Sequence, residues 1–168
     1  MTYNVHPIIV HFPIAFLVLY SLIVMLPVKR WFPHQSWKLT RLLLVGLGFL
    51  GILASMSSGE AAQSFTSGSR EVVKAHEAFA STSSWFYGLL LAGEILPFIA
   101  GKVLSHIPRS ASLFTLLNKV LRNETIVWLL ALGGFVALTI TGMLGGVLVH
   151  GTSADPLAAP LLNLLGIS

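Results

Sequence analysis

Three histidines and one glutamate stand at the ends of the apolar segments of this chain, and they are the side chains most able to do chemistry there. They are His11, Glu60, His76 and His150. If the segments cross a membrane as antiparallel helices, alternate segment ends meet on one side, so we expect all four side chains at similar depth. Ionisable groups at the edge of a bilayer are costly and usually mark a site. The pattern predicts a binding site at one end of a helical bundle.

Small residues share a helix face with each of these histidines, four or eight positions toward the membrane centre. They are Ala15 beside His11, Ala80 beside His76, and Gly146 and Gly142 beside His150. Residues four apart stack on one helix face, and a flat macrocycle held by an imidazole needs small neighbours there. The pattern suits a haem b held edge-on between helices by two histidines. The same spacing also lets membrane helices pack closely without any cofactor.

Two histidines from different helices would hold the haem iron from opposite sides. The first and third helices of an up-and-down bundle are diagonal, so His11 with His76 is the first choice of ligands and His76 with His150 the second. His6 is a helix cap, a second-shell partner, or a ligand paired with His150. Two cations outside the third span and close to His76 are candidates to meet the haem propionates: Arg70 and Lys74. Bis-histidine iron has no open position, which favours electron transfer over oxygen chemistry.

The same side chains support two other interpretations. Three imidazoles and a carboxylate, one from each helix, resemble the metal sites built inside four-helix bundles, and imidazole suits copper, zinc and iron ions. The ligands of such a non-haem metal site would be His11, Glu60, His76 and His150. In the third interpretation the histidines only make hydrogen bonds, and the chain is a structural accessory subunit without a cofactor. We expect an electron carrier or an accessory subunit rather than a stand-alone enzyme.

The composition is that of a membrane protein. Hydrophobic residues make up 55% of the chain and charged residues only 10%, which is far outside the range of soluble domains. The absence of cysteine excludes disulfides, iron–sulfur clusters and thiolate zinc sites. The formal net charge of +4 comes from basic residues spread around apolar segments. Because such residues set membrane topology, we expect no nucleic-acid partner.

Four apolar runs are long enough to cross about 30 Å of hydrocarbon as helices. The predicted spans are residues 8–28, 42–60, 77–101 and 126–150, and residues 112–121 predict a short helix on the membrane surface. The alternation of apolar and polar residues that marks a β-barrel is missing, so helices are expected. The sequence therefore predicts a single all-α domain, an integral membrane four-helix up-and-down bundle.

Basic residues orient this bundle. They cluster after the first and third spans, as Lys29, Arg30, Lys38 and Arg41, and as Lys102, Arg109, Lys119 and Arg122. Loops rich in lysine and arginine stay in the cytoplasm, so both termini are expected outside the bacterial inner membrane. The expected partners are the lipid bilayer and other membrane redox subunits or further copies of the chain.

Glu94 is a lone carboxylate near the middle of the third predicted span. Thr139 and Thr141 of the fourth span lie at comparable depth and are candidates to hydrogen-bond it. Such a carboxylate can relay protons, or it can be a protonated packing residue held by hydrogen bonds. The sequence leaves both roles open.

Several segments resemble a family of small bacterial membrane proteins with four helices, mostly described only as a domain of unknown function. Residues 6–15 read HPIIVHFPIA and are similar to the start of that family. Residues 58–60, His76 and the segment 145–151 resemble its later features. The resemblance covers most of the chain and implies a four-helix membrane fold, but it implies no activity.

Overall fold

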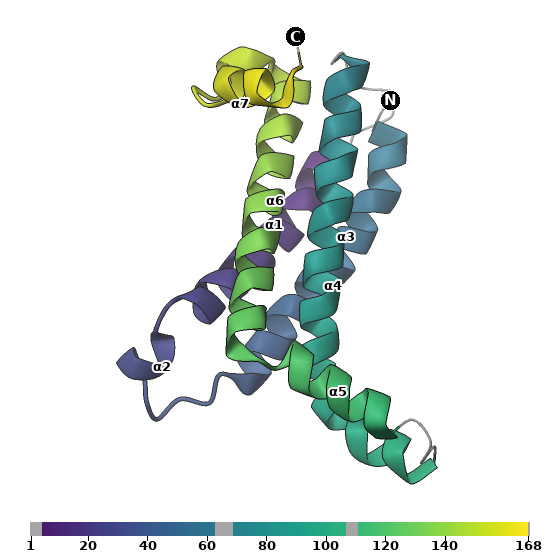
Figure 1. Ribbon diagram of the computed structural model, residues 1–168. Helices are drawn as coiled ribbons and strands as arrows, with labels where there is room; N and C mark the ends of the chain where they lie inside the picture. The colour runs from purple at the N-terminus through teal and green to yellow at the C-terminus, as the bar shows by residue number, and fades with distance from the viewer. Residues whose placement is uncertain (1–4, 63–68, 107–110, 168) are drawn as a thin grey trace.

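The structure is a computed structural model that describes residues 5–62, 69–106 and 111–167 (Figure 1). Every regular element in these ranges is helical, so the predicted all-α class is confirmed. The four long helices are α1 (His6–Met25), α3 (Lys38–Ala62), α4 (Arg70–His106) and α6 (Glu124–His150). The short elements are α2 (Val28–Trp31), α5 (Ala111–Leu121), the 3₁₀ turn η3 (Thr152–Ala154) and α7 (Ala158–Leu165). Arg109, one of the basic residues used to orient the chain, lies outside the described residues.

Each long helix packs against the next one along the chain, and α6 returns to pack on α1. His6 at the start of α1 meets Ser58 near the end of α3. His76 near the start of α4 meets Thr141 near the end of α6. These contacts make the neighbouring helices antiparallel. We call the end where α1 and α4 begin the histidine end, and the opposite end the basic end.

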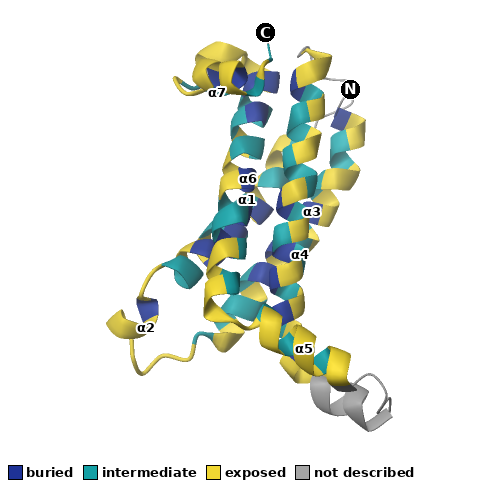
Figure 2. Ribbon diagram, in the orientation of Figure 1, coloured by how far each residue is buried: buried dark blue, intermediate teal, exposed yellow. Residues whose placement is uncertain are grey.

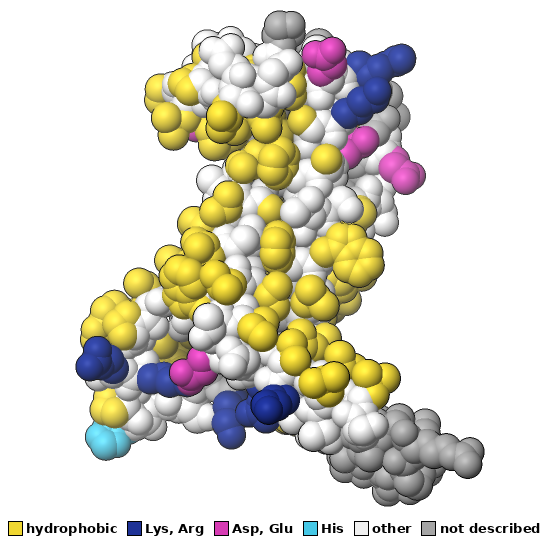
Figure 3. All heavy atoms as spheres, viewed as in Figure 1, with side chains coloured by type: hydrophobic (Ala, Val, Ile, Leu, Met, Phe, Trp, Pro, Cys, Tyr) yellow, Lys and Arg dark blue, Asp and Glu magenta, His cyan; other side chains and the backbone are white. Residues whose placement is uncertain are grey.

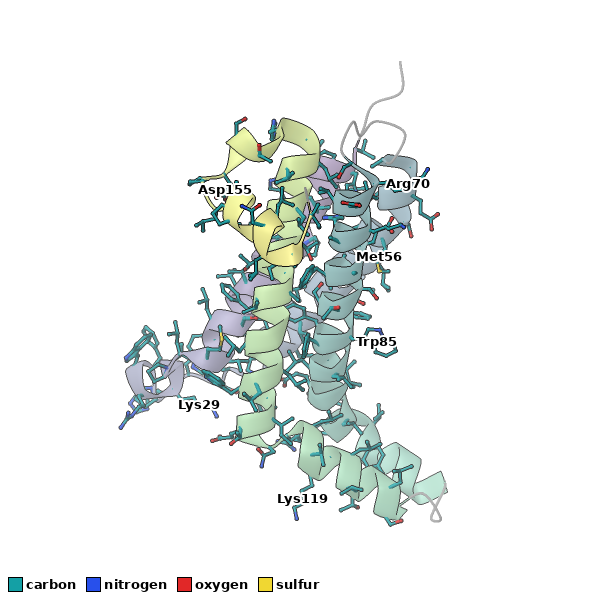
Figure 4. The ribbon with its side chains drawn as sticks, turned by 45° about the horizontal axis from the view of Figure 1, so that its top comes forward. Lys29, Met56, Arg70, Trp85, Lys119 and Asp155 are labelled. Atoms are coloured by element: carbon teal, nitrogen blue, oxygen red, sulfur yellow. The ribbon has the colours of Figure 1, made fainter. Side chains whose placement is uncertain are left out.

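The two ends of the molecule carry different side chains. Figure 4 shows Arg70 and Asp155 at the histidine end and Lys29 and Lys119 at the basic end. In the face seen in Figure 3, charged side chains lie toward the two ends and hydrophobic ones cover the waist between them. The outward faces of the long helices are exposed along much of their length (Figure 2). Exposed apolar surface of this extent is typical of a protein that meets lipid or another protein.

Glycines bring α1 and α3 close together. A Cβ placed on Gly51 of α3 would lie 2.9 Å from Pro13 Cδ of α1, which is too close for any side chain. Pro13 itself is buried although it lies in the middle of a helix. Small residues at helix contacts are the usual means of close packing in membranes. Gly48 also faces α1, where an added Cβ would meet Leu17, so these two glycines of α3 serve helix packing.

Among the residues that the structure describes, three helices are long and apolar enough to cross a membrane, namely α1, α3 and α6. The fourth long helix, α4, carries a run of hydroxyl side chains at residues 81–84 and the carboxylate of Glu94, which make it more polar.

Helix α1 ends at Met25 because Leu26 precedes a proline and is extended, with a ψ of 153°. Helix α6 begins at an Asn123 cap, whose side chain accepts hydrogen bonds from the backbone N–H groups of Thr125 and Ile126.

Candidate functional site

His76 is held against α6 by a hydrogen bond. Its Nδ1 lies 3.0 Å from the carbonyl oxygen of Thr141, which can only accept, so Nδ1 carries the proton. The lone pair of the ring then resides on Nε2. A bond from Nδ1–H to a backbone carbonyl is the usual way in which a metal-binding histidine is oriented, with Nε2 toward the metal. Burial lowers the pKa of His76 below its usual value, which keeps the ring neutral at pH 7.

His6 has the same tautomer as His76. Its Nδ1 lies 2.8 Å from Ser58 Oγ, and that hydroxyl already donates its proton to the Ser55 carbonyl oxygen at 3.1 Å. Nδ1 of His6 must therefore donate to Ser58 Oγ. His6 is thus bonded to α3, whereas His76 is bonded to α6.

His11 lies on a different face of α1. Its side chain is exposed, and its Nδ1 donates to the carbonyl oxygen of Pro7, one turn earlier in the same helix. His11 precedes Ile14 by three residues and Val18 by seven, so the three share one helix face. Ile14 and Val18 both face α6 across a groove.

This groove has a volume of about 440 Å³ and lies between α1 and α6. Gly142, Gly146 and His150 of α6 form part of its wall. A Cβ placed on Gly142 or Gly146 would have nothing within 4 Å, so both glycines border open space. The structure therefore places one of the predicted histidine faces on the wall of a groove.

Asp155 lines the same groove and was missed by sequence reasoning. Its Oδ1 accepts a hydrogen bond of 2.8 Å from the backbone N–H of Leu157. This is the turn that an aspartate before a proline commonly forms, so the Asp155-Pro156 pair was the available signal. The carboxylate is thereby fixed on the groove wall, where His150 also lies.

The remaining predicted site residues lie on several surfaces. Exposed are Ala15 on α1, Glu60 at the end of α3, and Arg70 and Lys74 at the start of α4; Ala80 on α4 is half-buried. Within the described residues, which include every member of the predicted His/Glu ring, no three His, Cys, Asp or Glu side chains are grouped as a metal site requires. The physical reason is helix rotation, because His76 faces inward while Glu60 and His150 are exposed.

Glu94 has partners that the sequence analysis did not propose. Arg41 Nη2 lies 2.5 Å from Glu94 Oε1, and the Tyr20 hydroxyl donates to the same oxygen at 3.2 Å. The guanidinium carbon of Arg41 also lies 5.8 Å from the centre of the Tyr20 ring. This cluster joins α1, α3 and α4 near the basic end. The ion pair favours the packing role of Glu94, in charged rather than protonated form.

The threonines expected beside Glu94 bond elsewhere, so that expectation is wrong. Thr139 and Thr141 each donate at 2.8 Å to a carbonyl oxygen one turn earlier in α6. Such local bonds satisfy hydroxyl groups within a membrane helix. The signal for the true pair was an arginine one turn inside α3 together with Glu94, which stands far along the next antiparallel helix from the other two carboxylates of α4, Glu71 and Glu77.

Comparisons with known proteins assign no role to these side chains. The chain matches no protein-family model, no curated protein and no solved structure.

Proposed function

We propose that the protein spans the bacterial inner membrane as a four-helix bundle with both termini outside, and that it binds haem b at its histidine end to pass electrons. Three helices apolar enough to span support the membrane part. The basic residues around α2, α5 and the helix ends beside them support a cytoplasmic basic end. The resemblance of residues 6–15 to small four-helix membrane proteins supports the same topology.

The groove between α1 and α6 carries the haem proposal. Its volume of about 440 Å³ falls within the usual range of small-molecule sites, about 300–1,000 Å³. Gly142 and Gly146 provide a wall without side chains, against which a flat macrocycle can lie. His150 lines the groove beside them. The residues present therefore fit one face of a porphyrin and one axial imidazole.

His11 is the second ligand that fits this groove best. It lies on α1, on the face that carries the groove residues Ile14 and Val18. Its Nδ1 is engaged by the Pro7 carbonyl, which leaves Nε2 as the nitrogen able to bind iron. Haem b supplies a reversible one-electron change of its iron. His11 and His150 would hold it and leave no position for oxygen.

The absorption spectrum of purified protein tests this proposal. We expect a Soret band that shifts on dithionite reduction, with sharp alpha bands, either as isolated or after titration with haemin. His150→Ala and His11→Ala should each abolish the bis-histidine spectrum, because one axial ligand is lost. The matched control is His34→Ala, which removes an exposed histidine at the basic end and should leave the spectrum unchanged.

Other outcomes would contradict the proposal at different points. Loss of haem in His76→Ala or His6→Ala, with full binding in His11→Ala and His150→Ala, would show that His6 and His76 are the ligands instead. A colourless protein that takes up no haemin but contains stoichiometric copper, zinc or iron would instead support the ion-binding alternative. A protein with neither cofactor would leave the histidines a structural role as an accessory subunit.

A further inference from the structure

A second cavity, of about 870 Å³, lies at the basic end. It is bordered by α1, α3, α4 and α6 and by the segment between α1 and α3. Its wall includes the Tyr20–Arg41–Glu94 cluster together with Trp37. It lies at the opposite end of the long helices from the proposed haem groove, so it is a separate site.

Two nitrogen donors on this wall need an acceptor. Trp37 Nε1 and Arg41 Nε are buried and have no hydrogen-bond partner within the part of the chain that the structure describes. Both residues line the cavity. Nearly all buried polar groups in proteins have a partner, so these two N–H groups indicate a bound molecule that carries acceptor oxygens.

The wall also carries Lys38 and Arg122, but the charge closest to the two donors favours a neutral acceptor. Arg41 is already matched by Glu94 at 2.5 Å, and Lys29 is 3.6 Å from Glu124. A phosphate placed against Arg41 Nε would lie close to the Glu94 carboxylate, where repulsion is strong at low dielectric. A carbonyl oxygen can accept from the same N–H groups without that repulsion.

The remaining wall suits a flat ring with an apolar tail. Trp37, Phe98 and Trp128 supply aromatic surfaces, from three different parts of the chain. Phe98 is 65% exposed and Trp128 is 41% exposed, so the cavity borders the outer apolar face of the molecule. A ring that packs between aromatic side chains could therefore extend its tail into lipid.

We propose that this cavity binds the ring of a membrane quinone, whose carbonyl oxygens accept hydrogen bonds from Trp37 Nε1 and Arg41 Nε. The site depends on the protein's lying in a membrane, and it does not depend on haem at the histidine end. No electron transfer is part of this proposal.

Tryptophan fluorescence of the full chain in detergent micelles, titrated with decylubiquinone, tests quinone binding. Saturable quenching is expected in the wild type. Trp37→Phe keeps an aromatic ring but removes the indole donor, and its dissociation constant should rise about tenfold, the loss of one buried hydrogen bond. Trp85→Phe also removes one tryptophan, from the exposed face of α4, and should bind as the wild type does.

Two further measurements decide the ligand class. Trp128→Leu removes an aromatic wall and leaves both donors, so it should also weaken quinone binding, with the three remaining tryptophans as reporters. Equal quenching without saturation in the wild type, Trp37→Phe and Trp85→Phe would overturn the proposal. Such a result would mean that the quinone only partitions into the micelle and binds no site on the protein. Displacement of bound quinone by phosphatidylglycerol at equal mole fraction would also overturn it in favour of an anionic lipid. None of these outcomes affects the haem spectrum, so the two proposals fail independently.

Discussion

At the scale of single residues, the sequence predicted depth along the helices better than direction around them. All the candidate histidines lie at one end because segment ends alternate in an antiparallel chain. Their pairing depends on the rotation of each helix about its axis, and a difference of one residue turns a side chain by about 100°. That rotation turns His76 toward Thr141 of α6. The rotation of each helix is set by packing contacts, such as that of Gly145 against the His76 ring. These contacts are not visible in the sequence.

Burial of His76 makes stability depend on pH. Its folded pKa lies below the unfolded value of 6.5, so the unfolded chain binds more protons between the two values. The neutral ring therefore favours folding above pH 6.5, and this advantage is lost as the pH falls through that window. Thermal unfolding of the protein in detergent should show a larger decrease in Tm from pH 7.5 to pH 5 than His76→Gln shows. His34→Gln, which alters an exposed ring, should retain the wild-type decrease; an equal loss in both variants would contradict the assignment.

At the scale of the elements, hydropathy located the long helices, and glycine spacing explains their approach. The ends of the helices depend on local chemistry, such as Pro27 after α1. Hydropathy predicts α4 as a span like the other three long helices. Its hydroxyl run at residues 81–84 and Glu94 nevertheless make it more polar than they are. Thr82, Ser83 and Ser84 donate to carbonyl oxygens within α4 itself. Glu94 is instead paired with Arg41 of the neighbouring helix α3.

Two glycines of α3 give a matched test of the α1–α3 contact. Gly51→Ala would place a Cβ 2.9 Å from the rigid ring of Pro13, so we expect a loss of about 1–3 kcal/mol. Gly46→Ala meets only a Leu91 methyl group at 3.9 Å, and alanine favours a helix by about 0.5–1 kcal/mol over glycine. Circular dichroism melts should therefore show a lower Tm for the first variant and an equal or higher Tm for the second. A similar Tm for both would argue against close α1–α3 packing.

At the scale of the whole molecule, the absence of cysteine allows a direct test of orientation. Ser153 is exposed at the histidine end and His34 is exposed at the basic end. A membrane-impermeant maleimide should label Ser153→Cys in spheroplasts, because the proposed topology places that end outside. It should label His34→Cys only after the membrane is opened. The reverse pattern would place the basic end outside and contradict the proposed topology.

The ion pair between Arg41 and Glu94 constrains how the chain is assembled in the bilayer. A lone arginine or acidic side chain in the hydrocarbon is unfavourable by about 2.5–3.5 kcal/mol on insertion scales. These two charges lie on consecutive helices, α3 and α4, and meet at 2.5 Å. Helix α3 is apolar enough to cross by itself, with Arg41 at its basic end, but α4 carries Glu94 well inside its length. If the chain enters a bilayer, α4 is therefore best released together with α3, as a hairpin. The same residues that hold the mature fold would thus couple the synthesis of α4 to the lateral release of α3.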